Sequence, residues 1–206
     1  MVHALVIGGT GMLANTSLWL VGQGFHVSVI GRNEFRMESV IHQSSDSSQI
    51  TPIIVDYCNI PLLQTKLRAT IEQNGPIDLV IAWIHSYAGR TLESIVSEVS
   101  SCRNRPWKLF HILGSSANLS GIQENLNLPN SALYYQIQLG FIIENGHSRW
   151  LTNEEISQGV IDSIRQNRLI TIVGTLQPWE KRYVIIIEAI NLRLTICRRG
   201  LLYFIG

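Results

Sequence analysis

The sequence has little excess charge of either sign and few cysteines. Its 206 residues include 16 Lys and Arg against 15 Asp and Glu, a net charge of +1, and the basic residues are scattered along the chain. Nucleic-acid-binding proteins gather positive charge on one face, so the sequence predicts no nucleic-acid partner and no attraction to an anionic membrane. Cys58, Cys102 and Cys197 are far apart and lack the spacing of zinc ligands. We therefore expect reduced thiols, a cytoplasmic protein and no metal site.

Long uninterrupted apolar runs are also missing. The segment 184–206 is strongly apolar at both ends, but a glutamate and three arginines interrupt it, whereas a membrane-spanning helix needs about 20 nearly charge-free residues. The N-terminus leads directly into an apolar strand pattern, without the basic region of a signal peptide. We expect no membrane span and no secretion. We also expect one nucleotide-binding domain over 1–182, followed by an apolar tail of unknown role over 183–206.

Short runs of β-branched and aliphatic residues alternate with segments of helical spacing. This alternation is typical of a parallel sheet with helices on both faces, so we predict a doubly wound α/β Rossmann fold with a mostly parallel seven-stranded sheet. The expected strands are His3 to Ile7, Phe25 to Ile30, Ile50 to Val55, Ile77 to Ala82, Trp107 to Leu113, Gln136 to Ile143 and Leu169 to Val173. The expected helices are Met12 to Val21, Glu34 to His42, Ile60 to Gln73, Thr91 to Cys102 and Asn153 to Gln166. The last helix has the clearest start, because Thr152 or Asn153 can cap it and two glutamates oppose its dipole.

A glycine-rich turn joins the first expected strand to the first expected helix. Glycines allow a tight turn and the close approach of backbone to a pyrophosphate, and a small residue lets the helix pack closely on the strand. The pyrophosphate then binds N–H groups at the positive end of the helix. In this strand–turn–helix context the motif predicts a dinucleotide site. The turn reads Gly8, Gly9, Thr10, Gly11, Met12, Leu13 and Ala14.

The end of the second expected strand favours NADP over NAD. NAD sites place a carboxylate there for the ribose hydroxyls, whereas this chain has Arg32, whose guanidinium suits a 2′-phosphate. Ligands of open α/β sheets bind at the carboxyl ends of the strands, so further cofactor contacts are expected beyond the second, third and fourth strands. Asp56 either accepts from the adenine amino group or caps the next helix. The remaining expected contacts are Asn33, Tyr57, Ala82, Trp83 and Ile84.

Together these residues resemble the short-chain dehydrogenase/reductase superfamily, over about Val2 to Thr175. The glycine-rich turn resembles the GxxGxxA loop of its extended and atypical branches. Arg32 resembles the basic residue of its NADP users, and Asp56 the aspartate beside adenine. Ser115 and Ser116 follow the fifth expected strand, where this family keeps its catalytic serine. The resemblance implies a Rossmann fold, a nicotinamide cofactor, a small-molecule substrate, and homodimers or homotetramers.

The sequence lacks the catalytic pair of that family, a tyrosine followed four positions later by a lysine. Here Tyr134 is followed by Gln138 and Tyr135 by Leu139, in a segment that reads as a strand. A tyrosine without a nearby cation is a poor base at neutral pH, but it can still donate a proton. Tyr134 and Tyr135 are therefore either catalytic acids or packed strand residues. His85 is a second candidate acid, since imidazoles exchange protons near neutral pH, or else it lines the cofactor site.

Four further features bear on the substrate. Ser115 and Ser116 either orient a substrate carbonyl or bond to local backbone. The connection from Ser115 to Ser131 has no clear structure, and its length favours a substrate loop or lid. Arg149 either binds a substrate carboxylate or stacks on the adjacent tryptophan. His111 lies inside an expected strand and is predicted to be structural.

Two functions are consistent with these features. The first is an NADP-dependent oxidoreductase of the short-chain dehydrogenase/reductase type that acts on a small carbonyl or imine. The alternative is a non-catalytic sensor or regulatory protein that binds NADP on the same fold. The missing tyrosine–lysine pair favours the sensor, whereas a long loop beside the nicotinamide favours catalysis. Fold alone does not decide between them.

Overall fold

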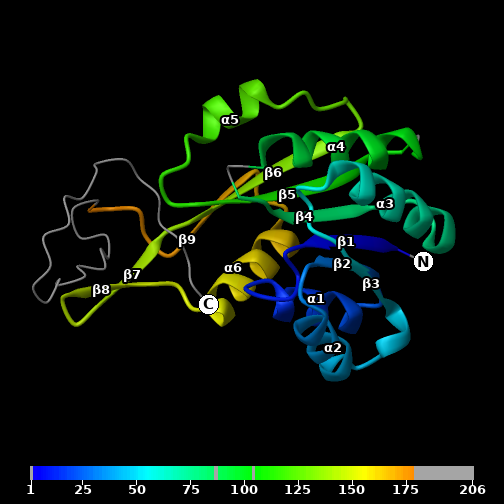
Figure 1. Ribbon diagram of the computed structural model, residues 1–206. Helices are drawn as coiled ribbons and strands as arrows, with labels where there is room; N and C mark the ends of the chain where they lie inside the picture. Colours follow the sequence, from blue (N-terminus) through cyan, green and yellow to red (C-terminus); the bar gives the residue numbers. More distant parts are fainter. Residues whose placement is uncertain (1, 86–87, 104, 179–206) are drawn as a thin grey trace, which may run out of the picture.

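The computed structural model describes residues 2–85, 88–103 and 105–178. Its main sheet has seven parallel strands in the order β3-β2-β1-β4-β5-β6-β9 (Figure 1). The predicted doubly wound Rossmann fold is confirmed. Its strand order reverses between β1 and β4, where open α/β sheets form a ligand crevice at the carboxyl ends of the strands. The strands are β1 (His3–Ile7), β2 (His26–Gly31), β3 (Ile50–Ile54), β4 (Leu79–Trp83), β5 (Trp107–Leu113), β6 (Ala132–Leu139) and β9 (Ile170–Val173).

Helices cover both faces of the sheet (Figure 1). Side chains alternate along each strand, so β1 contributes the fully buried Ala4 and Val6 to one apolar core and Leu5 and Ile7 to the other. The first core is closed by α1, α2 and α6, and the second by α3 and α4. The helices are α1 (Ala14–Gly22), α2 (Glu34–Gln43), a short 3-10 helix (Ser47–Gln49), α3 (Ile60–Asn74), α4 (Gly89–Ser101), α5 (Leu119–Asn125) and α6 (Asn153–Gln166).

The sixth strand differs from its predicted bounds. The expected single strand Gln136 to Ile143 is two elements, because the chain leaves the sheet at Gly140. Beyond it, Phe141 exchanges two backbone hydrogen bonds with Thr175, of 2.9 and 2.8 Å, in an isolated antiparallel bridge. A side chain at Gly140 would collide with the carbonyl of Thr175. This close approach joins residues distant in sequence, so local strand propensity did not reveal it.

A separate two-stranded sheet follows this break. β7 (Phe141–Glu144) pairs antiparallel with β8 (His147–Trp150), and the hairpin projects from the end of β6 (Figure 1). Asn145 and Gly146 form the turn, with φ of 50° and 79°. Positive φ at both central residues suits the tight turn of a hairpin. The hairpin carries the chain from β6 to the start of α6.

The connection Ser115 to Ser131, predicted to have no clear structure, contains α5. Asn118 caps this helix by accepting from the backbone N–H of Gly121 at 3.2 Å. None of the seven residues of α5 is fully buried. A helix this short without a buried stripe lacks the apolar periodicity by which helices are predicted from sequence. α5 lies over β5 and β6 beside α4 (Figure 1).

The predicted tail 183–206 and Cys197 lie outside the described residues, as does the boundary at 182. Within the described part of the chain, no helix has both the length and the apolar character needed to cross a membrane.

Candidate functional site

A cavity of about 840 Å³ lies at the carboxyl ends of the strands, where β1, β2, β4, β5 and β6 finish. The structure therefore brings together the glycine-rich turn, the arginine after β2 and the serines after β5. The predicted residues that line this cavity are Gly8, Thr10, Gly11, Met12, Arg32, Asn33, Tyr57, Trp83, His85, Ser115 and Ser116. The other predicted residues, which do not line it, are Gly9, Leu13, Asp56, Ala82, Ile84, Tyr134 and Tyr135.

The glycines of the turn have different physical tasks. Gly8 has φ of +80°, a left-handed conformation that favours glycine. A Cβ on Gly9 would lie 2.7 Å from Val29 and 2.8 Å from Ser17, so this glycine lets the turn pack on β2 and α1. A Cβ on Gly11 would have no atom within 4 Å, and Gly11 lines the cavity. The open space beside Gly11, just before the N-terminus of α1, fits a pyrophosphate.

Arg32 lies at the mouth of the cavity with its guanidinium largely exposed. Its Nη1 is 3.7 Å from Oδ2 of Asp56, in an ion pair whose side chains are 68% and 48% exposed. The other Asp56 oxygen accepts from the backbone N–H of Cys58 at 2.9 Å. Asp56 therefore shapes the turn after β3, while Asn59 caps α3. The basic residue expected for an NADP site is present and has an acidic neighbour.

A second arginine, which was not predicted from the sequence, lines this end of the cavity. Arg36, on the first turn of α2, lines the cavity together with Arg32. Asn33 holds this turn, because its side-chain oxygen accepts from the backbone N–H of Arg36 at 2.9 Å. The signal was available in the sequence: an Asn cap places its third helical residue close to the end of the preceding strand. Two arginines therefore line the cavity beside the end of β2, where a 2′-phosphate is expected.

Aromatic side chains form the wall after β3 and β4. Trp83 and His85 meet edge to face, with ring centroids 5.7 Å apart, and the backbone N–H of His85 lies 3.5 Å from the Tyr57 hydroxyl. All three residues line the cavity. Ala82 and Ile84, the neighbours of Trp83 in the sequence, do not line this cavity. Ala82 is fully buried in β4, and Ile84 lines a second, neighbouring cavity.

The serines after β5 lie in a turn that is stabilised by hydrogen bonds within the turn and from β6. The backbone N–H of Ala117 donates to Gly114 at 3.1 Å. The side-chain amide of Gln138, on β6, donates to the carbonyls of Ser115 at 3.2 Å and Ala117 at 3.0 Å. These contacts fix the backbone that carries Ser115 and Ser116 at the cavity.

Tyr134 and Tyr135 lie inside β6 rather than at the cavity. Tyr134 is five residues before the end of the strand, about 16 Å from its carboxyl end. Its hydroxyl contacts Nδ1 of His111 at 2.9 Å, and burial raises its pKa to about 12. Tyr135 points to the opposite face and stacks on Phe110, with ring centroids 4.5 Å apart. The structure therefore separates both tyrosines from the expected cofactor position.

Residues of the hairpin and α6, which were not predicted from the sequence, line another side of the cavity. Leu139, Gly140, Trp150, Leu151 and Asn153 line it there. These residues run from the last residue of β6 to the first residue of α6. The types of these residues do not reveal a site in the sequence, because most of them are apolar or glycine.

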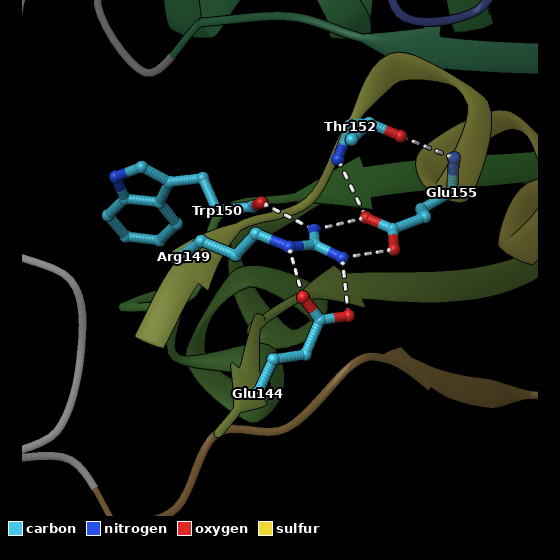
Figure 2. Close-up of polar contacts among 5 residues, drawn as sticks. All are labelled: Glu144, Arg149, Trp150, Thr152 and Glu155. Atoms are coloured by element: carbon cyan, nitrogen blue, oxygen red, sulfur yellow. Dashed lines mark hydrogen bonds and ion pairs between the residues drawn. The ribbon is translucent and has the colours of Figure 1, made fainter. Parts of the chain in front are cut away.

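Arg149 stabilises this side of the cavity. Figure 2 shows its guanidinium between the carboxylates of Glu144 and Glu155, each of which accepts two hydrogen bonds, of 2.8 to 3.0 Å. Glu155 also accepts from the backbone N–H of Thr152, whose hydroxyl accepts in return from Glu155, so the predicted cap of α6 is confirmed as a capping box. Arg149 is therefore engaged within the chain and ties the hairpin to α6, in place of the substrate role considered from the sequence.

Comparison with solved structures identifies the fold. A ketoreductase variant of actinorhodin polyketide synthesis, solved with NADPH, is 13% identical; the match covers 84% of this chain and 95% of that one, with a TM-score of 0.65. A short-chain dehydrogenase/reductase from Serratia marcescens is 16% identical over 84% of this chain and 97% of its own, also with a TM-score of 0.65. A glucose/ribitol dehydrogenase-type protein from Brucella melitensis is 10% identical over 83% and 94%, with a TM-score of 0.62.

These similarities show that the chain has the fold of short-chain dehydrogenases/reductases over most of its length. The resemblance recognised in the sequence is confirmed at the level of the fold. No protein-family model matches the sequence, and no curated protein matches it significantly.

Proposed function

We propose that the protein is an NADP-dependent oxidoreductase of the short-chain dehydrogenase/reductase type, acting on a small carbonyl or imine substrate. The observation that carries the proposal is that the open Gly11 position and two arginines, Arg32 and Arg36, line one cavity. The turn before α1 suits a pyrophosphate, and Arg32 and Arg36 suit the extra phosphate of NADP. A fold neighbour solved with NADPH supports the same cofactor class.

The residues around the opposite end of the cavity support reduction. Bound NADPH supplies a hydride. Ser115 and Ser116, held at the end of β5, orient the substrate oxygen or nitrogen by hydrogen bonding. His85 lines the same cavity and supplies the proton that balances the hydride. Tyr134 takes no part in this scheme, because it lies far down β6.

Cofactor preference tests the first half of the proposal. Calorimetric titration should show tighter binding of NADPH than of NADH. Arg32→Ala should weaken NADPH binding about 10- to 100-fold, as expected for a lost charge-assisted phosphate contact, and leave NADH binding nearly unchanged. Arg165→Ala is the matched control, since Arg165 lies on the last turn of α6, over Trp19. Equal affinities for the two cofactors in the wild type would overturn the assignment of NADP.

Turnover tests the second half. The absorbance of NADPH should fall steadily when the enzyme meets a reactive member of a panel of aldehydes, ketones and imines. Ser115→Ala combined with Ser116→Ala should lower kcat about 100-fold or more if the hydroxyls orient the reacting group. NADPH binding without turnover on any member of the panel would instead favour the sensor.

A further inference from the structure

A second cavity, of about 600 Å³, opens beside the cofactor cavity. Trp83, His85, Gly114 and Ser116 line both cavities, so the two adjoin at these residues. The second cavity descends between the start of α4, β5 and α5. Its walls are largely apolar, with Ile84, Leu92, Leu113, Ile122 and Leu126 among the lining residues. A molecule whose reacting group lies at Ser116 can therefore extend into this space.

One polar side chain deep in β5 faces the second cavity. His111 is only 7% exposed, yet it lines the cavity. Burial lowers its pKa to about 4, so the ring is neutral at physiological pH. Nδ1 contacts the Tyr134 hydroxyl at 2.9 Å. Among the described residues no hydrogen bond to Nε2 is found, and the His111 residue itself is part of the cavity lining.

The neighbours of His111 determine which ring nitrogen carries the proton. The side-chain nitrogen of Gln136 donates to the carbonyl of Leu119 at 2.9 Å, which fixes the orientation of the amide. The same nitrogen lies 3.4 Å from the Tyr134 oxygen, which must accept from it. The single hydroxyl hydrogen of Tyr134 is then available for Nδ1 of His111. Nδ1 accepts, and Nε2 carries the hydrogen.

The depth of His111 separates it from the reacting centre. His111 precedes Gly114 by three residues of extended strand, about 10 Å. An N–H donor at this depth contacts a part of the substrate remote from the group that accepts hydride. The charge of the lining also restricts the substrate. Glu93 is the acidic residue of the lining, and no lysine or arginine is among the lining residues that the structure describes. A substrate carboxylate would be repelled rather than bound.

We propose that the second cavity binds the body of the carbonyl substrate, and that Nε2–H of His111 donates to an acceptor oxygen at its far end. The inference rests on the proposed function and names its substrate class: an uncharged, mainly apolar carbonyl compound with a second oxygen acceptor, such as an ester, about 10 Å from the first. Recognition requires no proton transfer by His111. Gln136 and Tyr134 are positioning residues that keep its hydrogen on Nε2.

Nuclear magnetic resonance of protein labelled with ¹⁵N-histidine tests the tautomer directly. The His111 ring should show a protonated Nε2 and an unprotonated Nδ1 at neutral pH. Tyr134→Phe removes the donor to Nδ1 and should produce a mixture of both tautomers. Tyr135→Phe is the matched control, because the same substitution one residue later lies on the opposite face of β6 and should leave the ring signals unchanged. A protonated Nδ1 in the wild type would overturn the proposal.

Three probes of matched length test the ligand class by titration of the same ring signals without turnover. They are the methyl ester of azelaic semialdehyde, azelaic semialdehyde itself, and undecanal. The ester should bind about five- to tenfold more tightly than undecanal, the gain expected from one hydrogen bond to a buried donor. The charged acid should bind most weakly. His111→Phe has no ring signal at 111, so its binding is followed through the ring signals of His85, which lines both cavities; this variant should lose the advantage of the ester and still bind undecanal. Tyr134→Phe should reduce the advantage of the ester.

Equal affinity of the ester and undecanal, or tightest binding of the acid, would overturn this inference. The two proposals fail in distinguishable ways. If NADPH binds with the Arg32-dependent preference while the ester has no advantage, only the substrate class is wrong. If the ester binds at His111 while NADPH does not bind, the cofactor assignment is wrong and the ligand class of the second cavity stands.

Discussion

The guanidinium of Arg149 and the carboxylate of Glu155 face each other through two hydrogen bonds, of 2.8 and 2.9 Å (Figure 2). The same carboxylate also stabilises the start of α6, because Glu155 completes the capping box by accepting from the N–H of Thr152 at 2.9 Å. Trp150 and Leu151, between these residues, line the cavity at the carboxyl ends of the strands. The ion pair thus fixes one wall of the site by connecting the hairpin to the first turn of α6.

Acid should weaken this connection over a definite pH range. Hydrogen bonds from Arg149 hold the pKa of Glu155 at about 2, below its ordinary value of 4.5. A folded pKa below the unfolded one stabilises the protein above pH 4.5, and this stabilisation is lost as the pH falls towards 2. Glu155→Gln should therefore lower Tm at neutral pH and flatten its decline in acid, measured by circular dichroism. Glu154→Gln is the control, and an unchanged acid decline in Glu155→Gln would contradict the assignment.

Substitutions at Gly9 and Gly11, in the glycine-rich turn before α1, should affect stability and NADPH binding separately. Gly9→Ala places a methyl group 2.7 Å from Val29 and should lower the free energy of unfolding by about 1–3 kcal/mol. Gly11→Ala meets no atom within 4 Å and should change stability by less than about 0.5 kcal/mol. It should nevertheless weaken NADPH binding about tenfold or more, because the methyl occupies space for the pyrophosphate. Urea unfolding and calorimetry distinguish the two effects; tight NADPH binding by Gly11→Ala would refute the placement.

His111 should make the fold sensitive to mild acid. Its pKa of about 4 is below the ordinary 6.5, because burial disfavours the charged ring. Between these values the unfolded chain binds the proton and the folded chain does not, so stability falls as the pH drops from 6.5 to 4, by roughly 3 kcal/mol in total. Tyr134 contacts the ring, and His85 and Glu93 line the same cavity. His111→Gln should remove most of this slope in denaturant unfolding, and an equal slope would argue against a neutral buried ring.

Replacement of Gln138 should weaken substrate binding more than cofactor binding. Its amide holds the carbonyls of Ser115 and Ala117 at 3.2 and 3.0 Å. Gln138→Leu leaves these carbonyls without that donor and should cost about 1–3 kcal/mol of stability. KM for the carbonyl substrate should rise, while the Kd of NADPH, which depends mainly on the turn before α1, should change little. Gln158→Leu, on an exposed position of α6, is the control. Parallel losses of substrate and NADPH binding would contradict this division.

The features that the sequence predicted well depend on local chemistry. The turn before α1 and the cap at Thr152 each involve residues a few positions apart, so their patterns are visible in the chain itself. Gly140 illustrates the opposite case, since its requirement for glycine arises from Thr175, far along the chain. The interpretation of Tyr134 needed the register of β6, which places it well before the carboxyl end of the strand. Which polar residues reach a cavity depends on such non-local register.

The weak attachment of α5 has a practical consequence. None of its residues is fully buried, and Gln136 contacts it through the backbone carbonyl of Leu119, an atom that any residue supplies. The helix that covers the second cavity can therefore be exchanged for another of similar length without rebuilding the core. For protein engineering, 119–125 is a natural segment for grafting and for libraries, because the next residue, Leu126, already packs against the second core.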